Sequence, residues 1–481
     1  MMITVRPERR LTQKKEKNGA ISMTVTGIIA EYNPLHKGHE YQLKEARRLT
    51  GADYIVVVIS GCFTQRGTPA VLDKYDRAHM ALSCGADLVL ELPTRFACAS
   101  AEYFASGAVS VLNRLGCVDY LCFGSECGDT QALRSAAALL SRAEKSPEYQ
   151  HSLREAQKEG LSFPAARSRA LENSWGTFSE SFSEADVSLF SLPNNILGIE
   201  YCRALDALKS PIRPITIRRR GNYHDTELKE AHEGAASIKA SSTPDAPFSS
   251  ASAIRAALQN AGSSNADVPE AEESLFFSLP DVSRCLLFER SDGRGVVTEE
   301  DFSSLLRYRL LQLTEEEISG ENGVRTVSSA ALTAFADVTP SLADKIVRHL
   351  YTFTGWDDFC LRLRSRDLPY VRASRSLCHI LLNLKQDALD ESKAEGFPVY
   401  LRMLGFSERA LPLLTAIKKK AASPLLSRLT AAREQLSLKL LPLLEEEIRA
   451  SHIYQTIVSG KYGTPFLHEY QRQILCPPFN S

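Results

Sequence analysis

The first half of the chain alternates short apolar runs with amphipathic segments, and this alternation restricts the fold more than any other feature. Four apolar, partly β-branched runs are predicted to be buried strands: residues 24–30, 54–60, 87–92 and 118–124. Three segments between them have helical periodicity: about 39–49, 73–84 and 99–115. Strands that alternate with helices form parallel sheets covered on both faces. The sequence therefore predicts an α/β fold built on a doubly wound parallel sheet.

A tight turn with two histidines follows the first predicted strand. Pro34 ends that strand, and helical periodicity begins near residue 40, so His36 and His39 lie at a helix N-terminus. In open α/β sheets, phosphates bind at this edge. Gly38 lets a ligand approach the backbone, and each imidazole can donate an N–H to a phosphate oxygen. The alternative interpretation is two surface histidines at a helix start.

Other polar positions follow further predicted strands at the same edge. Arg66 lies in the loop after the second strand, and Gly124 ends the fourth. Residues 214–217 predict a fifth strand, which runs into three arginines at 218–220, a pattern typical of phosphate sites. A helix that opens near Ser250 adds serines and an arginine to its first turn. Each has an ordinary alternative: a surface arginine, a tight turn, a solvated basic edge or a serine cap.

Composition excludes several classes of protein. A chain of 481 residues is too long for one ordinary core and suggests two or three domains. No apolar run reaches the roughly 20 residues of a membrane span, so no membrane association is expected. The 11 cysteines include no Cys-x-x-Cys pair, which argues against a zinc knuckle or a disulfide framework and favours a reducing cytoplasm. Neither a dinucleotide-binding glycine motif nor a P-loop occurs.

The alternation of strands and helices stops after about residue 260. The expected organisation is a basic, disordered extension (1–22), an α/β domain (23–260), a linker (261–274) and a mainly helical part (275–481). Because the net charge is only −1, a role with nucleic acid requires local basic patches. Two such patches are candidates for RNA contact: Arg362, Arg364, Arg366, Tyr370, Arg372 and Arg375, and Lys418, Lys419 and Lys420. A solvated helix face is the alternative.

Seven stretches in order along residues 23–260 point to one family: 31–39 (Glu-Tyr-Asn-Pro-Leu-His-Lys-Gly-His), 60–70, 85–93, 123–126, 193–198, 223–225 and 250–255. On these stretches the chain resembles the bacterial tRNA(Met) cytidine acetate ligases, which have a HIGH-type nucleotidyltransferase fold with a His-x-Gly-His motif. The second half resembles the family more loosely. Cys62 occupies a position where the family pattern has asparagine.

The resemblance implies an ATP-dependent, adenylate-forming ligase. Acetate would attack the α-phosphate of ATP and release pyrophosphate, and the acetyl group would pass to the exocyclic amine of the wobble cytidine of elongator methionine tRNA. His36 and His39 would be catalytic and stabilise the charge that develops on the phosphates. No carboxylate cluster demands a metal, and Mg²⁺ with the nucleotide stays open.

The resemblance also implies a set of nucleotide contacts. The ATP-binding residues would be Ile29, Ala30, Glu31, Tyr32, Asn33, Pro34, Leu35, His36, Lys37, Gly38, His39, Glu40, Tyr41, Gln42, Gly124, Asn194 and Arg219. Arg66, Ser250, Ser252 and Arg255 are weaker phosphate candidates. Two other functions stay open: an adenylyltransferase acting on a small phosphorylated metabolite, and a non-catalytic RNA-binding protein with a vestigial nucleotide site. The sequence leaves the oligomeric state undetermined.

Overall fold

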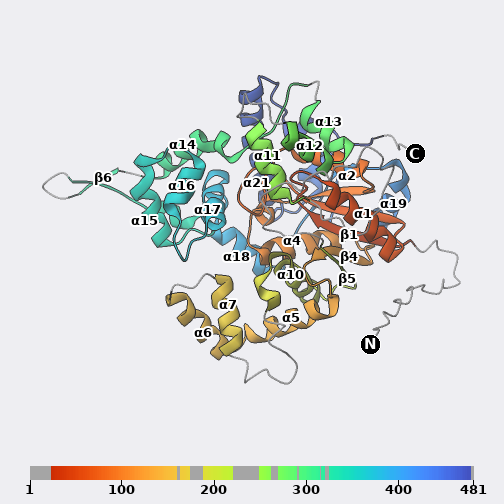
Figure 1. The fold of residues 1–481 in the computed structure, drawn as a ribbon, viewed down its shortest axis with the longest axis horizontal. Coiled ribbons are helices and arrows are strands. Elements are labelled where there is room, and N and C mark those ends of the chain that lie inside the picture. Colours follow the sequence, from red (N-terminus) through yellow and green to blue (C-terminus); the bar gives the residue numbers. More distant parts are fainter. Residues whose placement is uncertain are drawn as a thin grey trace.

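A mixed sheet lies at the centre of the molecule, with helices on both faces (Figure 1). The computed structural model describes residues 23–159, 163–173, 188–219, 249–261, 269–289, 292–314, 316–319 and 324–477. In the described chain this sheet has seven strands in the order β5-β4-β1-β2-β3-β8-β9. The expected extension at 1–22, the motif at 223–225 and the middle of the expected linker lie outside the described residues.

The five strands predicted in the first half of the chain are present and parallel to their neighbours. They are β1 (Val25–Ala30), β2 (Tyr54–Ser60), β3 (Leu88–Leu92), β4 (Tyr120–Ser125) and β5 (Arg213–Arg218). Each lies within two residues of its predicted bounds. β1 to β4 are almost fully buried and form continuous apolar runs that are easily recognised, whereas β5 is a partly exposed edge strand. The predicted doubly wound parallel α/β fold is confirmed.

Helices cover the two faces of this sheet. The helices of the first half are α1 (Lys37–Thr50), α2 (Lys74–Ser83), α3 (Thr94–Ala97), α4 (Ala101–Arg114), α5 (Thr130–Ala143), α6 (Pro147–Lys158), α7 (Phe163–Asn173), α10 (Pro193–Ala207) and α11 (Ala251–Ala261). Of these, α6 and α7 pack on each other away from the sheet (Figure 1). Ile28 and Val57 pack with α1 and α2, whereas their neighbours Ile29 and Val58 pack with α4 and α10. Successive strand residues thus supply two separate cores.

The second half of the chain is mainly helical, as predicted. Its helices are α12 (Pro269–Ser278), α13 (Asp281–Phe288), α14 (Ser303–Leu313), α15 (Pro340–His349), α16 (Trp356–Leu363), α17 (Tyr370–Leu382), α18 (Gln386–Ala394), α19 (Leu411–Lys420), α20 (Ala432–Gln435) and α21 (Leu441–Tyr462). Helices α14 to α17 form a lobe beside the sheet, on the left of Figure 1. Strands β6 (Glu316–Ser319) and β7 (Val324–Val327) pair with each other. None of the described helices combines the length and apolar character that a bilayer crossing requires.

Two strands of the second half differ from the expected division into separate domains. β8 (Leu401–Phe406) pairs antiparallel with β3, and β9 (Leu425–Leu426) pairs with β8. β8 is almost fully buried, so it completes the central sheet instead of standing apart from it. Residues 424–450 do not form one continuous helix; they contain β9, the short α20 and the first half of α21. The expected linker also overlaps α12, which begins at Pro269.

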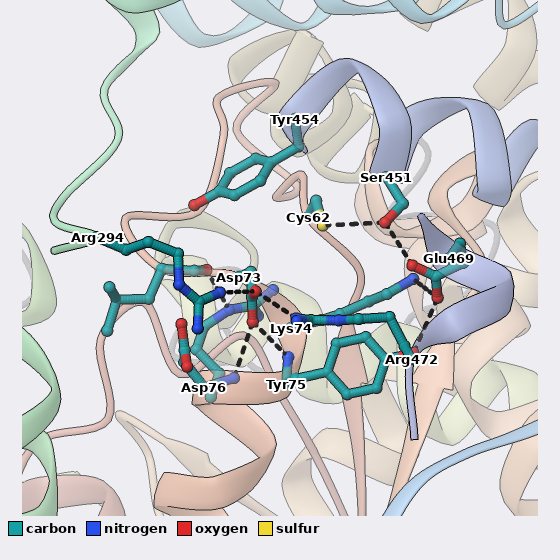
Figure 2. A network of polar contacts seen from close by, with 12 residues as sticks. Cys62, Asp73, Lys74, Tyr75, Asp76, Arg294, Ser451, Tyr454, Glu469 and Arg472 are labelled. Atoms are coloured by element: carbon teal, nitrogen blue, oxygen red, sulfur yellow. Dashed lines mark hydrogen bonds and ion pairs between the residues drawn. The ribbon is translucent and has the colours of Figure 1, made fainter. Parts of the chain in front are cut away.

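A cluster of buried charges joins the two halves of the chain. The Nζ atom of Lys74 in α2 lies 2.6 Å from Glu91 in β3, 3.1 Å from Glu447 in α21 and 2.9 Å from Glu469. All four side chains are at most 3% exposed. Figure 2 shows Lys74 and Glu469 in this network, with Ser451 donating a hydrogen bond to Glu469 at 2.7 Å. Helix α21 is therefore fastened to the sheet by ionic contacts that water does not screen.

The loop that follows β2 packs against α17. Ser374 Oγ donates a hydrogen bond of 3.0 Å to the carbonyl of Gly67. Gly67 has a φ of +72°, and a side chain there would collide with the backbone of Arg375. Glycine is therefore required at this position both by the left-handed backbone and by the close approach of the helix.

Candidate functional site

A cavity of about 290 Å³ opens at the carboxyl edge of the parallel strands. Its wall combines the ends of β1, β4 and β5, the first turn of α1, the loop after β2, parts of α4 and α10, and the start of α11. Segments far apart in the sequence meet there because parallel strands all end at the same edge. This is where the sequence predicts a ligand site.

The two histidines hold the first turn of α1 in place. His36 is the N-cap, and its Nδ1 accepts a hydrogen bond of 3.1 Å from the Gly38 amide. His39 Nδ1 accepts from the His36 amide at 3.4 Å. The two bonds form a capping box in which imidazoles replace the usual serine and glutamate. The rings stack with centroids 3.8 Å apart, and both line the cavity.

These hydrogen bonds determine which imidazole nitrogen can donate. Because both Nδ1 atoms accept from backbone amides, each neutral ring has its proton on Nε2. Burial, together with the charges of Arg219 and Arg255, lowers the pKa of His36 to about 3. The pKa of His39 is also well below its usual value, because of burial, His36 and the same arginines. The site thus presents two neutral rings with N–H donors at Nε2.

The lowered pKa of His36 predicts a loss of stability in mild acid. Above pH 6.5 neither state binds the proton, but below it the unfolded chain does, whereas folded His36 does so only near pH 3. The free energy of unfolding is therefore expected to fall by about 1.4 kcal/mol per pH unit below that point for each such histidine. Urea unfolding at several pH values measures this slope. His36→Asn, which keeps an N-cap acceptor, should reduce the slope, whereas the same change at exposed His151 should not. Equal slopes in wild type and His36→Asn would contradict the assignment.

A second group of polar contacts forms the β4 and β5 side of the cavity. Asn194 Nδ2 donates to Glu126 Oε1 at 2.6 Å, and Arg219 Nη1 donates to Asn194 Oδ1 at 3.2 Å. Glu126 also accepts from the backbone amides of Asn194 and Asn195, so it caps the start of α10. Gly124 lines the cavity beside Arg219, whose side chain would contact any Cβ at that position.

The start of α11 closes the cavity from a third direction. Ser250 Oγ accepts from the Ala253 amide at 3.0 Å, which is the ordinary role of a serine cap. Arg255 donates to the carbonyl of Asn33 at 2.9 Å and to Ser252 Oγ at 3.1 Å. Arg255 therefore ties α11 to the histidine turn, and Ser250, Ser252 and Arg255 all line the cavity.

Most residues predicted to bind ATP do lie on the cavity wall. They are Ile29, Ala30, Glu31, Tyr32, Asn33, His36, Gly38, His39, Tyr41, Gln42, Gly124, Asn194 and Arg219. Four members of the predicted stretch do not: Pro34, Leu35, Lys37 and Glu40. Leu35 is buried in the core under α1, Lys37 lies over the ring of Phe277, and Glu40 pairs with Lys44. A continuous motif cannot place every member on one surface, because successive side chains point in different directions.

Several wall residues were not among the predicted candidates. They are Gln65, Ala101, Phe104, Phe123, Pro193, Leu197, Tyr201, Ile217, Arg218 and Ala251. Arg218 could have been predicted, because it belongs to the run of arginines at 218–220. Phe104 and Tyr201 are core-like positions of α4 and α10 and have no sequence signal that separates them from ordinary packing. Cys62 is not on the wall; it is buried, faces Ser451, and burial raises its pKa to about 12.

The two basic patches predicted for RNA lie at opposite edges of the sheet. Arg372 and Arg375 are on α17, which packs against the loop that supplies Arg66 to the cavity. The lysines at 418–420 end α19, and just beyond them the Ala422 amide donates to the carbonyl of Arg114, at the amino edge of the strands. The structure thus places the arginine patch near the cavity and the lysine patch away from it. Arg364 and Arg366 are exposed, Arg362 pairs with Asp358, and the Tyr370 hydroxyl donates to Asp357.

The charge of the cavity favours an anionic ligand. Its described wall contains four arginines, at positions 66, 218, 219 and 255, and one carboxylate, Glu31. The amino end of α1 adds the positive end of a helix dipole. Within the described residues, no group of three or more histidine, cysteine, aspartate or glutamate side chains is arranged to hold a metal ion.

Comparisons with known proteins agree with this geometry. Residues 23–465 match the family model described as HIGH Nucleotidyl Transferase. The tRNA(Met) cytidine acetate ligase of Acetivibrio thermocellus is 39% identical over 433 residues, covering 90% of this chain and 94% of the relative. The ligase of the same name from Clostridium perfringens strain SM101 is 37% identical, covering 90% and 95%. The chain belongs to the tRNA(Met) cytidine acetate ligase family.

A solved member of the family has the same fold. The crystal structure of Thermotoga maritima TmcAL bound with alpha-thio ATP superimposes with a TM-score of 0.79 at 29% identity, covering 95% of this chain and all of that one. The resemblance recognised in the sequence is thereby confirmed. Both the family model and the structural superposition cover β8 and most of the second half of this chain, where the motifs in the sequence resembled the family more loosely.

Proposed function

We propose that this chain uses ATP to activate acetate and transfers the acetyl group to the wobble cytidine of elongator methionine tRNA. The observation that supports this most directly is the cavity itself, in which two N–H-donating histidines and four arginines converge at the carboxyl edge of the sheet. Family membership indicates the class of reaction. The histidines and arginines of the cavity are the groups that can bind the phosphates and stabilise their charge.

In the first step, a carboxylate oxygen of acetate attacks the α-phosphorus of ATP. The bond between that phosphorus and the bridging oxygen breaks, and pyrophosphate leaves with the bonding electrons. His36 and His39 donate from Nε2 to the phosphate oxygens on which negative charge develops. Because the rings are already fixed by the capping box, they need no reorganisation during the reaction. Arg219 and Arg255 offset the charge of the departing phosphates.

In the second step, the exocyclic amine of the cytidine attacks the acetyl carbonyl of the acetyl-adenylate. The amide bond forms, AMP leaves with the mixed-anhydride oxygen, and the amine gives up one proton. The product is N-acetylcytidine. The arginine patch on α16 and α17 adjoins the loop of Arg66, so we propose that the tRNA backbone lies across this part of the helical half.

The residues of the cavity fit ATP without a protein-bound metal. Anionic phosphates match the arginines and the amino end of α1, and Gly38 and Gly124 leave room for close approach to the backbone. Mg²⁺ would arrive with the nucleotide and neutralise its phosphates. Because its proposed substrate is a tRNA, we propose that the protein acts in the cytoplasm.

Exchange of pyrophosphate into ATP tests the proposed first step. Purified protein should exchange labelled pyrophosphate into ATP only when acetate is present. Mass analysis of methionine tRNA after incubation with ATP and labelled acetate should show one added acetyl group on the anticodon cytidine. Exchange that requires a phosphorylated metabolite instead of acetate would identify an adenylyltransferase, and RNA binding without any exchange would identify a non-catalytic protein.

A further inference from the structure

The cavity has two sides, one on each side of the histidine turn. β1 lies between β4 and β2 in the sheet, so the turn after β1 is central. Gly124, Asn194 and Arg219, the proposed nucleotide contacts, belong to the β4 and β5 side. On the other side the wall is formed by Arg66, from the loop after β2, and by Phe104 of α4. A second substrate therefore has this side of the cavity available beside the imidazoles.

Tyr201 of α10 supplies an unusual polar group between these two sides, because α10 borders β4 and shares a hydrophobic core with Phe104 of α4. Its side chain is 2% exposed, and its ring packs on Phe123 with centroids 5.3 Å apart. Within the part of the chain that the structure describes, its hydroxyl has no hydrogen-bond partner, although Tyr201 lines the cavity. Burial and the negative charge of Glu31 raise its pKa, so the phenol keeps its proton and remains a donor. A donor that faces the cavity and makes no hydrogen bond within the described protein is available to a ligand that can accept from it.

The neighbouring wall is apolar and confined. Phe104 is 2% exposed and belongs to the core formed by α4 and α10, and Ala101, one turn earlier, also borders the cavity. Such a surface suits a methyl group but leaves little room for a longer chain. Arg66 from the loop after β2 gives the same side a positive charge. A donor, a cation and a small apolar surface are what a short carboxylate requires.

We infer that Tyr201, Arg66 and Phe104 form the acetate subsite. The Tyr201 hydroxyl donates to one carboxylate oxygen, Arg66 offsets the negative charge, and Phe104 contacts the methyl group and limits the length of the acid. This inference rests on the proposed function and identifies where acetate, the substrate activated in the first step, binds. Glu31, the carboxylate on the wall, is held by the Gln65 amide at 2.8 Å, and the arginines outweigh its charge.

The test compares substrate dependence of the exchange reaction in matched variants. Tyr201→Phe should raise the KM for acetate about tenfold or more, the effect of one lost hydrogen bond to an ion, and change the KM for ATP less than about twofold. Phe104→Ala should raise kcat/KM for butyrate relative to acetate by about tenfold. Tyr400→Phe is the control, because Tyr400 is also buried with an unpartnered hydroxyl but lies off the cavity wall. Phe104→Leu gives a smaller change of the same sign should the alanine variant not fold.

The outcomes separate this inference from the function on which it rests. Wild-type exchange that does not need acetate would overturn both. Acetate-dependent exchange with an unchanged acetate KM in Tyr201→Phe would overturn the subsite alone. A Tyr201→Phe variant in which the KM for ATP rises as much as that for acetate would assign the tyrosine to the nucleotide and overturn the subsite as well.

Discussion

Replacing His39 by alanine is expected to abolish measurable acetate-dependent exchange of pyrophosphate into ATP, a loss of about 10²–10³-fold or more. In the proposed reaction, the Nε2–H of His39 is a fixed donor to the α-phosphate or the leaving pyrophosphate, and alanine offers no substitute. Water that enters the gap must reorganise as the charge develops, which restores little of the effect. Exchange of labelled pyrophosphate at saturating ATP and acetate measures the loss.

Two controls separate loss of chemistry from loss of structure. His39 also closes the capping box of α1, so its removal should cost about 1 kcal/mol of stability, and the thermal midpoint should fall only slightly. Binding of methionine tRNA, measured by filter retention, should survive. His151→Ala, on the exposed face of α6, should leave exchange unchanged. Exchange retained in His39→Ala would refute the catalytic role of this imidazole.

Replacing Lys74 by methionine is expected to destabilise the fold by about 3–5 kcal/mol. Methionine has a similar length but leaves Glu447 and Glu469 buried without their shared cation. Lys74 favours the charged forms of both, since its proximity holds the pKa of Glu469 at about 2 and lowers that of Glu447. Without the lysine, the two carboxylates must either bind protons or be reached by water that enters the core. Urea unfolding monitored by far-ultraviolet circular dichroism measures the change.

The loss of stability in Lys74→Met is expected because the ion pairs are buried. An exposed lysine in a similar pair is the matched control. Lys158→Met breaks an exposed pair with Glu155 on α6 and should leave the free energy of unfolding nearly unchanged. Adding Glu447→Gln to Lys74→Met should recover part of the loss, because an amide costs less to bury than an unpaired carboxylate. A Lys74→Met protein as stable as wild type would mean that the cluster does not fasten α21 to the sheet.

The first half of the fold was predictable because its signals are local. Val25–Ala30 is a continuous apolar run, and Pro34 and the two histidines follow within the next few residues, so strand, turn and helix start can all be recognised in one short window. The position of β8 could not be predicted, because pairing with β3 is a contact between residues more than 300 positions apart. A run of six residues such as Leu401–Phe406, apolar except for Arg402, is also ambiguous between strand and buried helix.

The residues of the cavity also divide into those with a local sequence signal and those without one. His36 and Arg219 were predicted because polar residues that follow buried strands are distinctive, and Gly124 because a glycine at a strand end leaves room for a ligand. Tyr201 was not, because an aromatic residue on the inner face of a helix is ordinary core until its surroundings are known. The charged cluster around Lys74 was not predicted either, because its three glutamates come from β3, α21 and the C-terminal segment, which no local pattern connects.

The place of β8 beside β3 has a consequence for how the protein is made. A ribosome must translate past Phe406 before β3 acquires its antiparallel neighbour, and past Glu469 before Lys74 contacts all three of its glutamates. Until then, the nascent sheet presents β3 as an open edge on which another chain can pair. Fragments that end between α11 and α12 are therefore expected to aggregate when expressed alone, and the enzyme completes itself only as synthesis finishes.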